Sequence, residues 1–464
     1  MTFTAIGSLG TTQAKDAVSA DPLSEELSIS PSRAVGVGRI VVVWLACDNT
    51  HDPANSGSQQ LYDTMACYDD EGNVYNTVVA THGTTSTHTH AQGAIFVSRI
   101  RNALSTSSVI TALMGQFPSD AVTARSISVE EFSVDEGYTW ATTQPVADFT
   151  TAADPEAIAI SGLPSGREYL FLHFLAAEGP ETDTYTWDSD YTQITGNGTT
   201  GGADDTNMHI RGGYRIATIT SDTVDITSDT ADRDYAQGLI ALAEVVLDAD
   251  FPTTPILDNF NRADVDPLDG VDWVTVSCGT TTPLRLARII SSQCAPGVTG
   301  PTGGQWRTET YIDGEDAEVY ATMAVEGWMQ IILGGEGCAN TGTAGGISML
   351  WLPEDRYSGL QPIREVIECG QMGLTGEVDE TILAWFDRGN DYKLGIQRRV
   401  EATHFWLDLG SGWTCINSIL NFGVYDNFKS GKLGFVVATP STTRMDDFGG
   451  GPSDTFVSQI YRRE

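Results

Sequence analysis

Basic residues are scarce in this chain of 464 residues. Lys and Arg total 25 against 62 Asp and Glu, which gives a formal net charge of -37 at pH 7. A surface of this sign repels phosphate and anionic lipid headgroups, so the composition argues against nucleic-acid binding and against membrane association. Such acidity keeps a strand-rich protein soluble and discourages edge-to-edge association, and we prefer this explanation to adaptation to a saline habitat.

Long apolar runs and a secretory signal are also missing. The most apolar run, from Ile40 to Cys47, is far too short to span a bilayer. The first residues, Met1 to Ile6, lack a basic start followed by an apolar core. We therefore expect a protein that is made in the cytoplasm, does not leave by the standard secretory route and has no membrane-inserted segment.

The seven cysteines form no metal-binding pattern, because no CxxC or Cys/His zinc spacing occurs. Cys47 ends an apolar run and is expected to pack as a small hydrophobic residue. Cys278 and Cys294 flank a predicted hairpin and could pair in an oxidising medium. Reduced thiols are the default expectation for a protein assembled in the cytosol.

Common catalytic signatures are absent, namely the Gly-x-Ser-x-Gly elbow, the P-loop and the dinucleotide fingerprint. The nearest match to a glycosidase carboxylate pair is the stretch from Glu315 to Glu318. Residues three apart on a strand point to opposite faces, whereas a retaining pair needs carboxyls roughly 5 Å apart on one face. We expect this stretch to be the solvated, acidic beginning of a strand, and we predict no catalytic residues and no enzymatic activity.

Short β-branched and aromatic runs, broken by Gly, Asp, Asn and Pro, dominate what is present, and they predict an all-β chain of tandem jelly-roll or β-sandwich modules. Residues 1–247 form the first module and contain a degenerate repeat, in which Gly38–Asn49 corresponds to Gly166–Ala177. Each of these runs contains few polar residues, as expected for a strand buried on both faces. The two halves either pack as one unit or form two small sandwiches in tandem.

Residues 248–256, which include Pro252 and Pro255, are predicted to be a stiff linker. A second jelly-roll module is expected over residues 257–450, followed by a tail over 451–464. Within this module, Ala317–Val325 alternates polar with apolar residues, which is typical of a half-buried antiparallel strand.

Calcium is the first cofactor that the sequence suggests, although the sequence requires none. Asp264, Asp266 and Asp269 resemble half of a calcium loop, but Thr275 stands where an EF-hand has its twelfth-position Glu. The alternative is ordinary turn chemistry, in which Asp caps its own backbone and Gly takes a positive φ.

A second metal candidate is the pair His88 and His90, which alternation places on one face of a strand, with His82 upstream. A polar loop leading into a strand explains these residues as well, because no third ligand stands at a recognisable spacing.

Aromatic residues beside turns are the candidate ligand-binding residues. Trp406 and Trp413 bracket a Gly-containing turn, and Trp187 and Tyr191 lie among aspartates. Sugar rings stack on aromatic faces and their hydroxyls bond to carboxylates, so both groups fit a glycan-binding surface. The alternative, which we favour, is that these rings pin long loops to a sandwich, because most aromatic side chains bury area.

The first region resembles an uncharacterised β-sandwich domain found in structural genes of tailed bacteriophages. The resemblance covers nearly all of residues 1–247. It is based on four motifs, Cys47–Asn49, Asp70–Tyr75, Leu163–Leu170 and Thr227–Arg233.

The second region resembles the concanavalin-like jelly rolls, of laminin-G or legume-lectin type, that occur in phage tail and fibre proteins. The matching residues are Asp258–Asp264, Asp272 with Trp273, Ala317–Thr322 and Met445–Gly450. In that fold the first and last strands lie side by side, which would bring Asp258–Phe260 next to Asp446–Phe448. The fold serves lectins, hydrolases and structural modules alike, so the resemblance implies no particular ligand.

Together these resemblances imply a non-enzymatic bacteriophage virion protein at the particle surface, in a tail fibre, tail tip or head spike. It would be assembled in the host cytoplasm and contact other virion proteins and a host-surface glycan or receptor. We expect a homo-oligomer, trimeric in a fibre or spike, with the first region attached to the particle and the second facing outward. The alternatives are a polysaccharide-degrading enzyme on the concanavalin-like fold and a bacterial surface adhesin.

Overall fold

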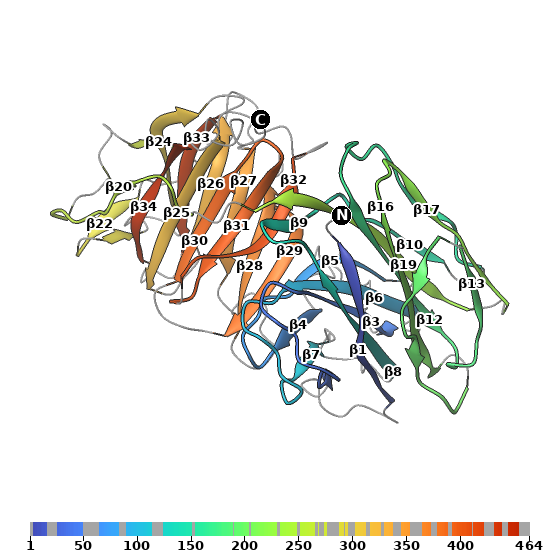
Figure 1. Cartoon of the computed structure of the whole chain (residues 1–464). Coiled ribbons are helices and arrows are strands. Elements are labelled where there is room, and N and C mark those ends of the chain that lie inside the picture. The colour runs from blue at the N-terminus through green and yellow to red at the C-terminus, as the bar shows by residue number, and fades with distance from the viewer. Residues whose placement is uncertain are drawn as a thin grey trace. The chain divides into compact units, whose positions relative to one another are not determined.

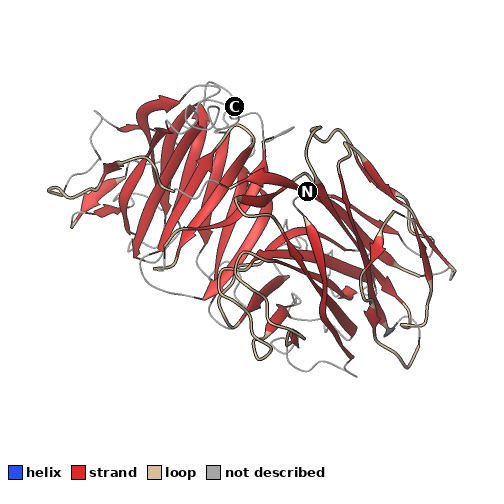
Figure 2. Cartoon of the chain, in the orientation of Figure 1, coloured by secondary structure: helices blue, strands red, loops and turns tan. Residues whose placement is uncertain are grey.

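The computed structural model consists of strands joined by loops, and its described residues contain no α-helix (Figure 2). The predicted all-β class is therefore confirmed. Within the described residues there is also no helix long and apolar enough to cross a membrane. The structure describes residues 3–15, 26–49, 65–82, 90–113, 124–150, 154–188, 190–203, 206–229, 233–247, 251–264, 268, 273–275, 287–291, 293–295, 302–311, 316–325, 329–336, 345–352, 364–372, 378–387, 392–410, 412–421, 431–438 and 444–453.

The chain forms two compact units. The first consists of Met1–Val246 together with two short later stretches, Tyr357–Ile363 and Leu383–Phe386, and the second consists of the other residues from Leu247 onward. Each unit contains two large antiparallel sheets (Figure 1), and smaller sheets accompany those of the first unit.

The first unit has one sheet from each of its predicted halves. The amino-terminal sheet has the order β1-β8-β3-β6-β5, and the second has the order β14-β16-β12-β19-β9, with β10 also on β19 and β15 on β16. The strand bounds are β1 Thr4–Lys15, β3 Ile40–Asn49, β5 Asn76–His82, β6 His90–Arg99, β8 Ala124–Ser133, β9 Tyr138–Thr142, β10 Val146–Thr150, β12 Tyr169–Glu178, β14 Thr192–Gln193, β15 Asn197–Gly198, β16 Met208–Ala217 and β19 Tyr235–Val246.

The two halves share one core, which is the first of the two predicted arrangements. β3 lies between β8 and β6 in one sheet, and β12 lies between β19 and β16 in the other. Side chains from both central strands meet in one buried cluster, with Val42 and Trp44 on one side and Leu172 and Phe174 on the other. The repeat seen in the sequence is thus a repeat of sheets that face each other.

Both central strands are buried on both faces, as the scarcity of polar residues in them predicts. The alternate residues of β3, such as Val43 and Cys47, pack in a second cluster beneath a small sheet in the order β2-β7-β4. Cys47 is fully buried there, which confirms its predicted role as a small hydrophobic residue. The remaining strands of this unit are β2 Glu26–Ile29, β4 Ala66–Asp69, β7 Ile110–Leu113 and two paired sets, β11 Ile158–Ile160 with β17 Asp222–Val224 and β13 Tyr185–Trp187 with β18 Ile226–Ser228.

The second unit also consists of two sheets. Their orders are β29-β28-β27-β26-β33-β24-β21 and β32-β31-β30-β25-β34-β23-β22, with β20 also paired to β34. Its strands are β20 Ile256–Asp258, β21 Trp273–Thr275, β22 Arg288–Ile290, β23 Gln293–Ala295, β24 Thr302–Tyr311, β25 Asp316–Val325, β26 Met329–Glu336, β27 Gly345–Leu352, β28 Arg364–Met372, β29 Val378–Asp387, β30 Tyr392–Arg398, β31 Ala402–Asp408, β32 Thr414–Leu420, β33 Gly431–Ala438 and β34 Arg444–Ser453.

The first and last strands of this unit pair with each other. Ile256 lies opposite Gly449, and Asp258 lies opposite Phe448. The predicted meeting of the Asp258–Phe260 and Asp446–Phe448 segments is therefore confirmed. The last strand runs to Ser453, so the predicted tail boundary at residue 451 falls inside β34, and residues 454–464 lie outside the described part.

Candidate functional site

A row of four polar side chains crosses the second unit from strand to strand. Glu318 on β25 lies opposite Gln397 on β30, Gln397 opposite His404 on β31, and His404 opposite Ser418 on β32. Strand alternation turns their neighbours, such as Val319, to the apolar core and turns the row to the opposite face of the sheet. All four are nevertheless buried, with at most 1% of their surface exposed.

Glu318 was expected to lie in solvent at the acidic start of its strand, and that prediction is wrong. Its carboxylate accepts hydrogen bonds from the backbone N–H of Thr253 (2.8 Å) and of Thr254 (3.2 Å) and from both threonine hydroxyls (3.0 and 3.2 Å). It also accepts from Gln397 Nε2 (2.9 Å) and forms an ion pair with Arg399 (3.3 Å). A buried carboxylate is tolerated when it is bonded in this way. Glu315 lies outside the described residues.

The segment Phe251–Thr254, which we call the strap, covers this face of the sheet. The Phe251 ring stacks on Trp406 with centroids 5.0 Å apart and planes 7° apart. It lies over Gly395, where a Cβ would come within 2.4 Å of the Phe251 ring. The strap lies within the predicted linker 248–256, so this part of the linker is not a free spacer. It is bonded to the second unit, and the chain then enters β20 at Ile256. Residues 248–250 are not among those described.

Tyr320 holds the far end of the strap. Its hydroxyl donates to the main-chain carbonyl of Thr254 (2.8 Å). Burial, and next the charge of Glu318, raise the pKa of Tyr320 to about 12, so the hydroxyl remains a donor across the physiological range.

The two predicted ligand-binding tryptophans are brought together by the strap. Trp413 is half-buried and meets the Phe251 ring edge-on at 4.8 Å, while Trp406 is 4% exposed. Both rings pack within one apolar cluster with Phe251 and Tyr320. This arrangement is the pinning of a segment to a sheet that we favoured from the sequence, and binding of a ligand by these residues stays a prediction.

Asp408 forms the turn between the two tryptophans. It accepts from the N–H groups of Gly410 (2.8 Å) and Gly412 (2.9 Å) and from Lys393 Nζ (3.2 Å). Burial pushes its pKa upward, but these amide donors and the lysine outweigh burial and leave the pKa below its ordinary value. The turn is thereby fixed at the edge of the strap.

The predicted calcium loop is described only in part. Asp264 is exposed and its carboxylate accepts from the N–H of Ser291 (2.8 Å). Asp266 and Asp269 lie outside the described residues. Across the described part of the chain, no group of three or more His, Cys, Asp or Glu side chains is arranged to hold a metal ion.

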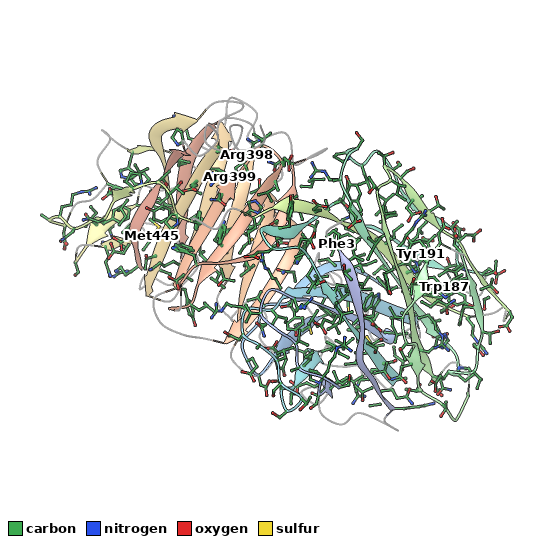
Figure 3. The ribbon with its side chains drawn as sticks, viewed as in Figure 1. Phe3, Trp187, Tyr191, Arg398, Arg399 and Met445 are labelled. Carbon is green, nitrogen blue, oxygen red and sulfur yellow. The ribbon has the colours of Figure 1, made fainter. Side chains whose placement is uncertain are left out.

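The other predicted ligand-binding aromatic residues, Trp187 and Tyr191, lie in the first unit. Both residues, which are labelled in Figure 3, are nearly buried. Trp187 meets the imidazole of His173 edge-on at 5.2 Å. The Tyr191 hydroxyl donates to Asp222 (2.8 Å), so both rings cover the second sheet of the first unit.

Of the predicted metal-binding histidines, His88 lies outside the described residues, and so do the side chains of His82 and His90. Cys294 is buried, while Cys278 is not described.

The motif Asp70–Tyr75 belongs to a clasp centred on the preceding residue, Asp69. The Asp69 carboxylate accepts from the N–H groups of Glu71 and Asn73, from Asn73 Nδ2 (2.9 Å) and from the Tyr75 hydroxyl (3.1 Å). Asn73 in turn accepts from the N–H groups of Arg101 and Asn102. Burial raises the pKa of Asp69 against these donors. The sequence indicated the motif but not its purpose, which is to bind two loops together.

Asp258 forms a second clasp at the start of the second unit. Its carboxylate accepts from both terminal nitrogens of Arg262 (2.7 and 3.0 Å), from Trp273 Nε1 (2.9 Å) and from the N–H of Phe260 (2.8 Å). Burial opposes ionisation, but the bonds from Arg262 and Trp273 outweigh it and lower the pKa of Asp258. The motif residues Asp258, Arg262 and Trp273 are thus used to join β20 to β21.

No family model and no curated protein matches the chain. Among solved structures, the metal-free VIP36 exoplasmic/lumenal domain is 10% identical, over 39% of this chain and 84% of that one, with a TM-score of 0.28. A Bacillus subtilis protein of unknown function with a galectin-like fold is 14% identical, over 39% and 89%, with a TM-score of 0.27. The Bacillus subtilis carbohydrate-binding module CBM66 is 9% identical, over 38% and 91%, with a TM-score of 0.21. Scores this low support no conclusion about the ligand or role of this chain.

Proposed function

We propose that the protein is a non-enzymatic structural protein of a tailed-bacteriophage virion that contacts glycans or a receptor on the host surface. It is assembled in the host cytoplasm, docks on other virion proteins and works as a homo-oligomer, trimeric in a fibre or spike. The first unit attaches to the particle and the second faces outward.

The observation that supports this proposal best is how the motif side chains are used. Glu318 accepts from main-chain N–H groups of the distant strap, whereas Asp69 and Asp258 accept from N–H groups of their own loops and reach other segments through Asn73 and Trp273. These acids thus hold loops and the strap in place. A protein that must keep its loops in place at a particle surface needs such clasps. The formal charge of -37 suits the same role, because it keeps a strand-rich surface from pairing with others edge to edge.

Immunogold labelling tests the location. Antibodies against the full chain are applied to particles released from a culture that carries the gene, with antibody pre-absorbed on the pure chain as the control. Label at one defined place on the particle is the expected result. Particles that contain the other virion proteins but never bind the antibody would refute the proposal.

Two further measurements separate the competing classes. The full chain should bind host cells and compete with particle adsorption without releasing new reducing ends from host capsule or exopolysaccharide. Steady release of sugar would instead favour the polysaccharide-degrading enzyme. A gene that lies outside any virus or prophage would favour the bacterial adhesin.

A further inference from the structure

We propose that the strap is a displaceable occupant of a binding slot on β25, β30 and β31, and that the ligand of this slot is a neutral sugar ring. This inference rests on the proposed glycan contact and assigns it to a place. It concerns Phe251–Thr254 and the side chains beneath them in the second unit alone.

The slot is filled by one six-membered ring, the phenyl group of Phe251. Gly395 forms its floor, because a Cβ there would come within 2.4 Å of the Phe251 ring and 3.1 Å of Trp413. Trp406 forms one face, parallel to the Phe251 ring at 5.0 Å, and Trp413 closes the end at 4.8 Å. A sugar ring with an apolar face stacks on an indole in the same parallel manner as the phenyl ring that now occupies the slot.

The polar end of the slot already holds hydroxyl groups. Of the hydrogen bonds that the Glu318 carboxylate accepts, four come from the strap, two of them from the hydroxyls of Thr253 and Thr254. Within the described part of the chain, its other donors are Gln397 of β30 and Arg399 in the turn between β30 and β31. When the strap leaves, the carboxylate keeps these two partners and presents its remaining acceptor positions. A ligand with adjacent hydroxyls satisfies them as the two threonines do.

An unused donor lies at the same place. The indole Nε1 of Trp406 is buried and, among the described residues, has no hydrogen-bond acceptor. A buried N–H without a partner costs free energy, and the apolar phenyl ring of Phe251 offers it none. The indole N–H points outward in the plane of the ring, so a hydroxyl that extends from a stacked sugar past the edge of the indole would supply the acceptor, which the phenyl ring cannot do.

Strap and sugar compete, so the affinity of the whole chain for sugar is lowered by the fraction of molecules in which the slot is open. Removing the Phe251 ring should open the slot and tighten binding of a simple sugar by about 100-fold. A strap that is only a permanent cover would behave differently, because its loss would expose apolar surface without creating affinity for a sugar.

The experiment uses the full chain, with Phe251→Ala as the opening variant and methyl glucoside, methyl galactoside and methyl mannoside as probes in calorimetric titrations. The expected result is binding of at least one probe by Phe251→Ala, weaker binding by the wild-type chain, and loss of that binding in Phe251→Ala/Trp406→Ala. Phe251→Ala that keeps its circular dichroism spectrum and cooperative unfolding but binds none of the three probes overturns the proposal.

A second variant is available if Phe251→Ala does not fold. Gly395→Ala places a methyl group against the Phe251 ring, and Gly36→Ala is its control, since a Cβ at Gly36 meets no atom within 4 Å. Hydrogen exchange at the Thr253 and Thr254 amides should accelerate at least tenfold in Gly395→Ala alone, with the amides of β25 and β30 unchanged. If the Thr253 and Thr254 amides exchange equally fast in the two variants, or if they accelerate only when all amides of the second unit do, the strap cannot leave by itself. Either result overturns the proposal.

The outcomes separate this inference from the proposed function. Wild-type binding to host cells with no gain of sugar affinity in Phe251→Ala leaves the surface-contact function intact and refutes the slot. Sugar binding by Phe251→Ala without any attachment of the wild-type chain to cells or particles supports the slot and refutes the function.

Discussion

The indole Nε1 of Trp44 donates a 2.9 Å hydrogen bond to the main-chain carbonyl of His173, which lies 129 positions later in the sequence. Trp44 is on the central strand of one sheet and His173 on the central strand of the other. Gly212 makes the approach possible, because a Cβ there would be 3.0 Å from both the Trp44 ring and the His173 carbonyl oxygen. This bond links the central strands of the two halves within their shared core.

Trp44→Phe should destabilise the first unit. The change removes the donor of this bond and leaves a space in a core without solvent, so we expect a loss of roughly 2 to 4 kcal/mol in the free energy of unfolding. Urea denaturation with hydrogen exchange at β3 and β12 amides measures it. The control is Trp413→Phe, which alters a half-buried ring of the second unit. Unchanged protection of β12 in Trp44→Phe would show that the bond contributes nothing.

Gly93→Ala should destabilise the same core by overpacking. A Cβ at Gly93 would come within 2.4 Å of the Phe174 ring and 2.9 Å of Ala176 Cβ, and such crowding costs about 1 to 3 kcal/mol. The double variant Gly93→Ala/Phe174→Leu should lose less than the sum of the two single variants, because the smaller side chain makes room. The measurement is a double-mutant cycle in urea, with Gly36→Ala as the neutral control. If the losses of stability in the two single variants simply add in the double variant, the predicted contact between position 93 and the Phe174 ring is contradicted.

Asp258→Asn should weaken the second unit. The amide keeps one acceptor oxygen but turns an NH2 group toward Arg262 or Trp273, so we expect a loss of about 2 to 4 kcal/mol. Because the folded pKa of Asp258 lies below its unfolded value, its contribution is present above the unfolded pKa and is lost as pH falls through the folded one. Thermal unfolding at neutral pH measures the change.

Asp264→Asn is the matched control for Asp258→Asn. Its carboxylate is exposed and accepts the bond from the Ser291 N–H, so its loss should alter stability by less than about 0.5 kcal/mol. A large effect of Asp264→Asn beside a small one of Asp258→Asn would reverse our ranking of the two aspartates.

The first unit should become less stable in mild acid because of two buried histidines. Burial lowers the pKa of both His173 and His209 to about 3, while the unfolded value is 6.5. The unfolded chain therefore binds more protons below pH 6.5, and stability declines as pH falls from there toward 3. The loss between pH 7 and pH 5 is about 2 kcal/mol for each histidine.

His209→Asn tests this origin of the pH dependence. The asparagine amide can replace the His209 donor to the carbonyl of Gly179, which lies 3.0 Å from Nδ1, but it cannot titrate. Urea denaturation at several pH values should give a variant that is weaker at neutral pH and has a shallower decline into acid. If the two curves run parallel from pH 7 to pH 5, protonation of His209 is not the cause.

Sequence alone determined the strands and their faces. The run Ile40–Cys47 had to be buried on both sides, and the alternation in Ala317–Val325 had to separate Val319 from Glu318, because side chains on a strand alternate by geometry. The pairing of β20 with β34 was also within reach, since the resemblance of the chain ends to a known jelly roll predicted it.

Only the tertiary structure decided what lies on the polar faces. Strand alternation places Glu318 on the polar face, where a solvated side chain is expected. Nothing near it in the sequence indicates that Thr253 and Thr254, some 65 positions earlier, bond to its carboxylate. The same holds for Trp44 and His173, whose contact depends on the two halves facing each other. Alternation fixes the direction of a side chain locally, but its burial depends on which distant segment covers it, and that is settled by packing of the whole chain.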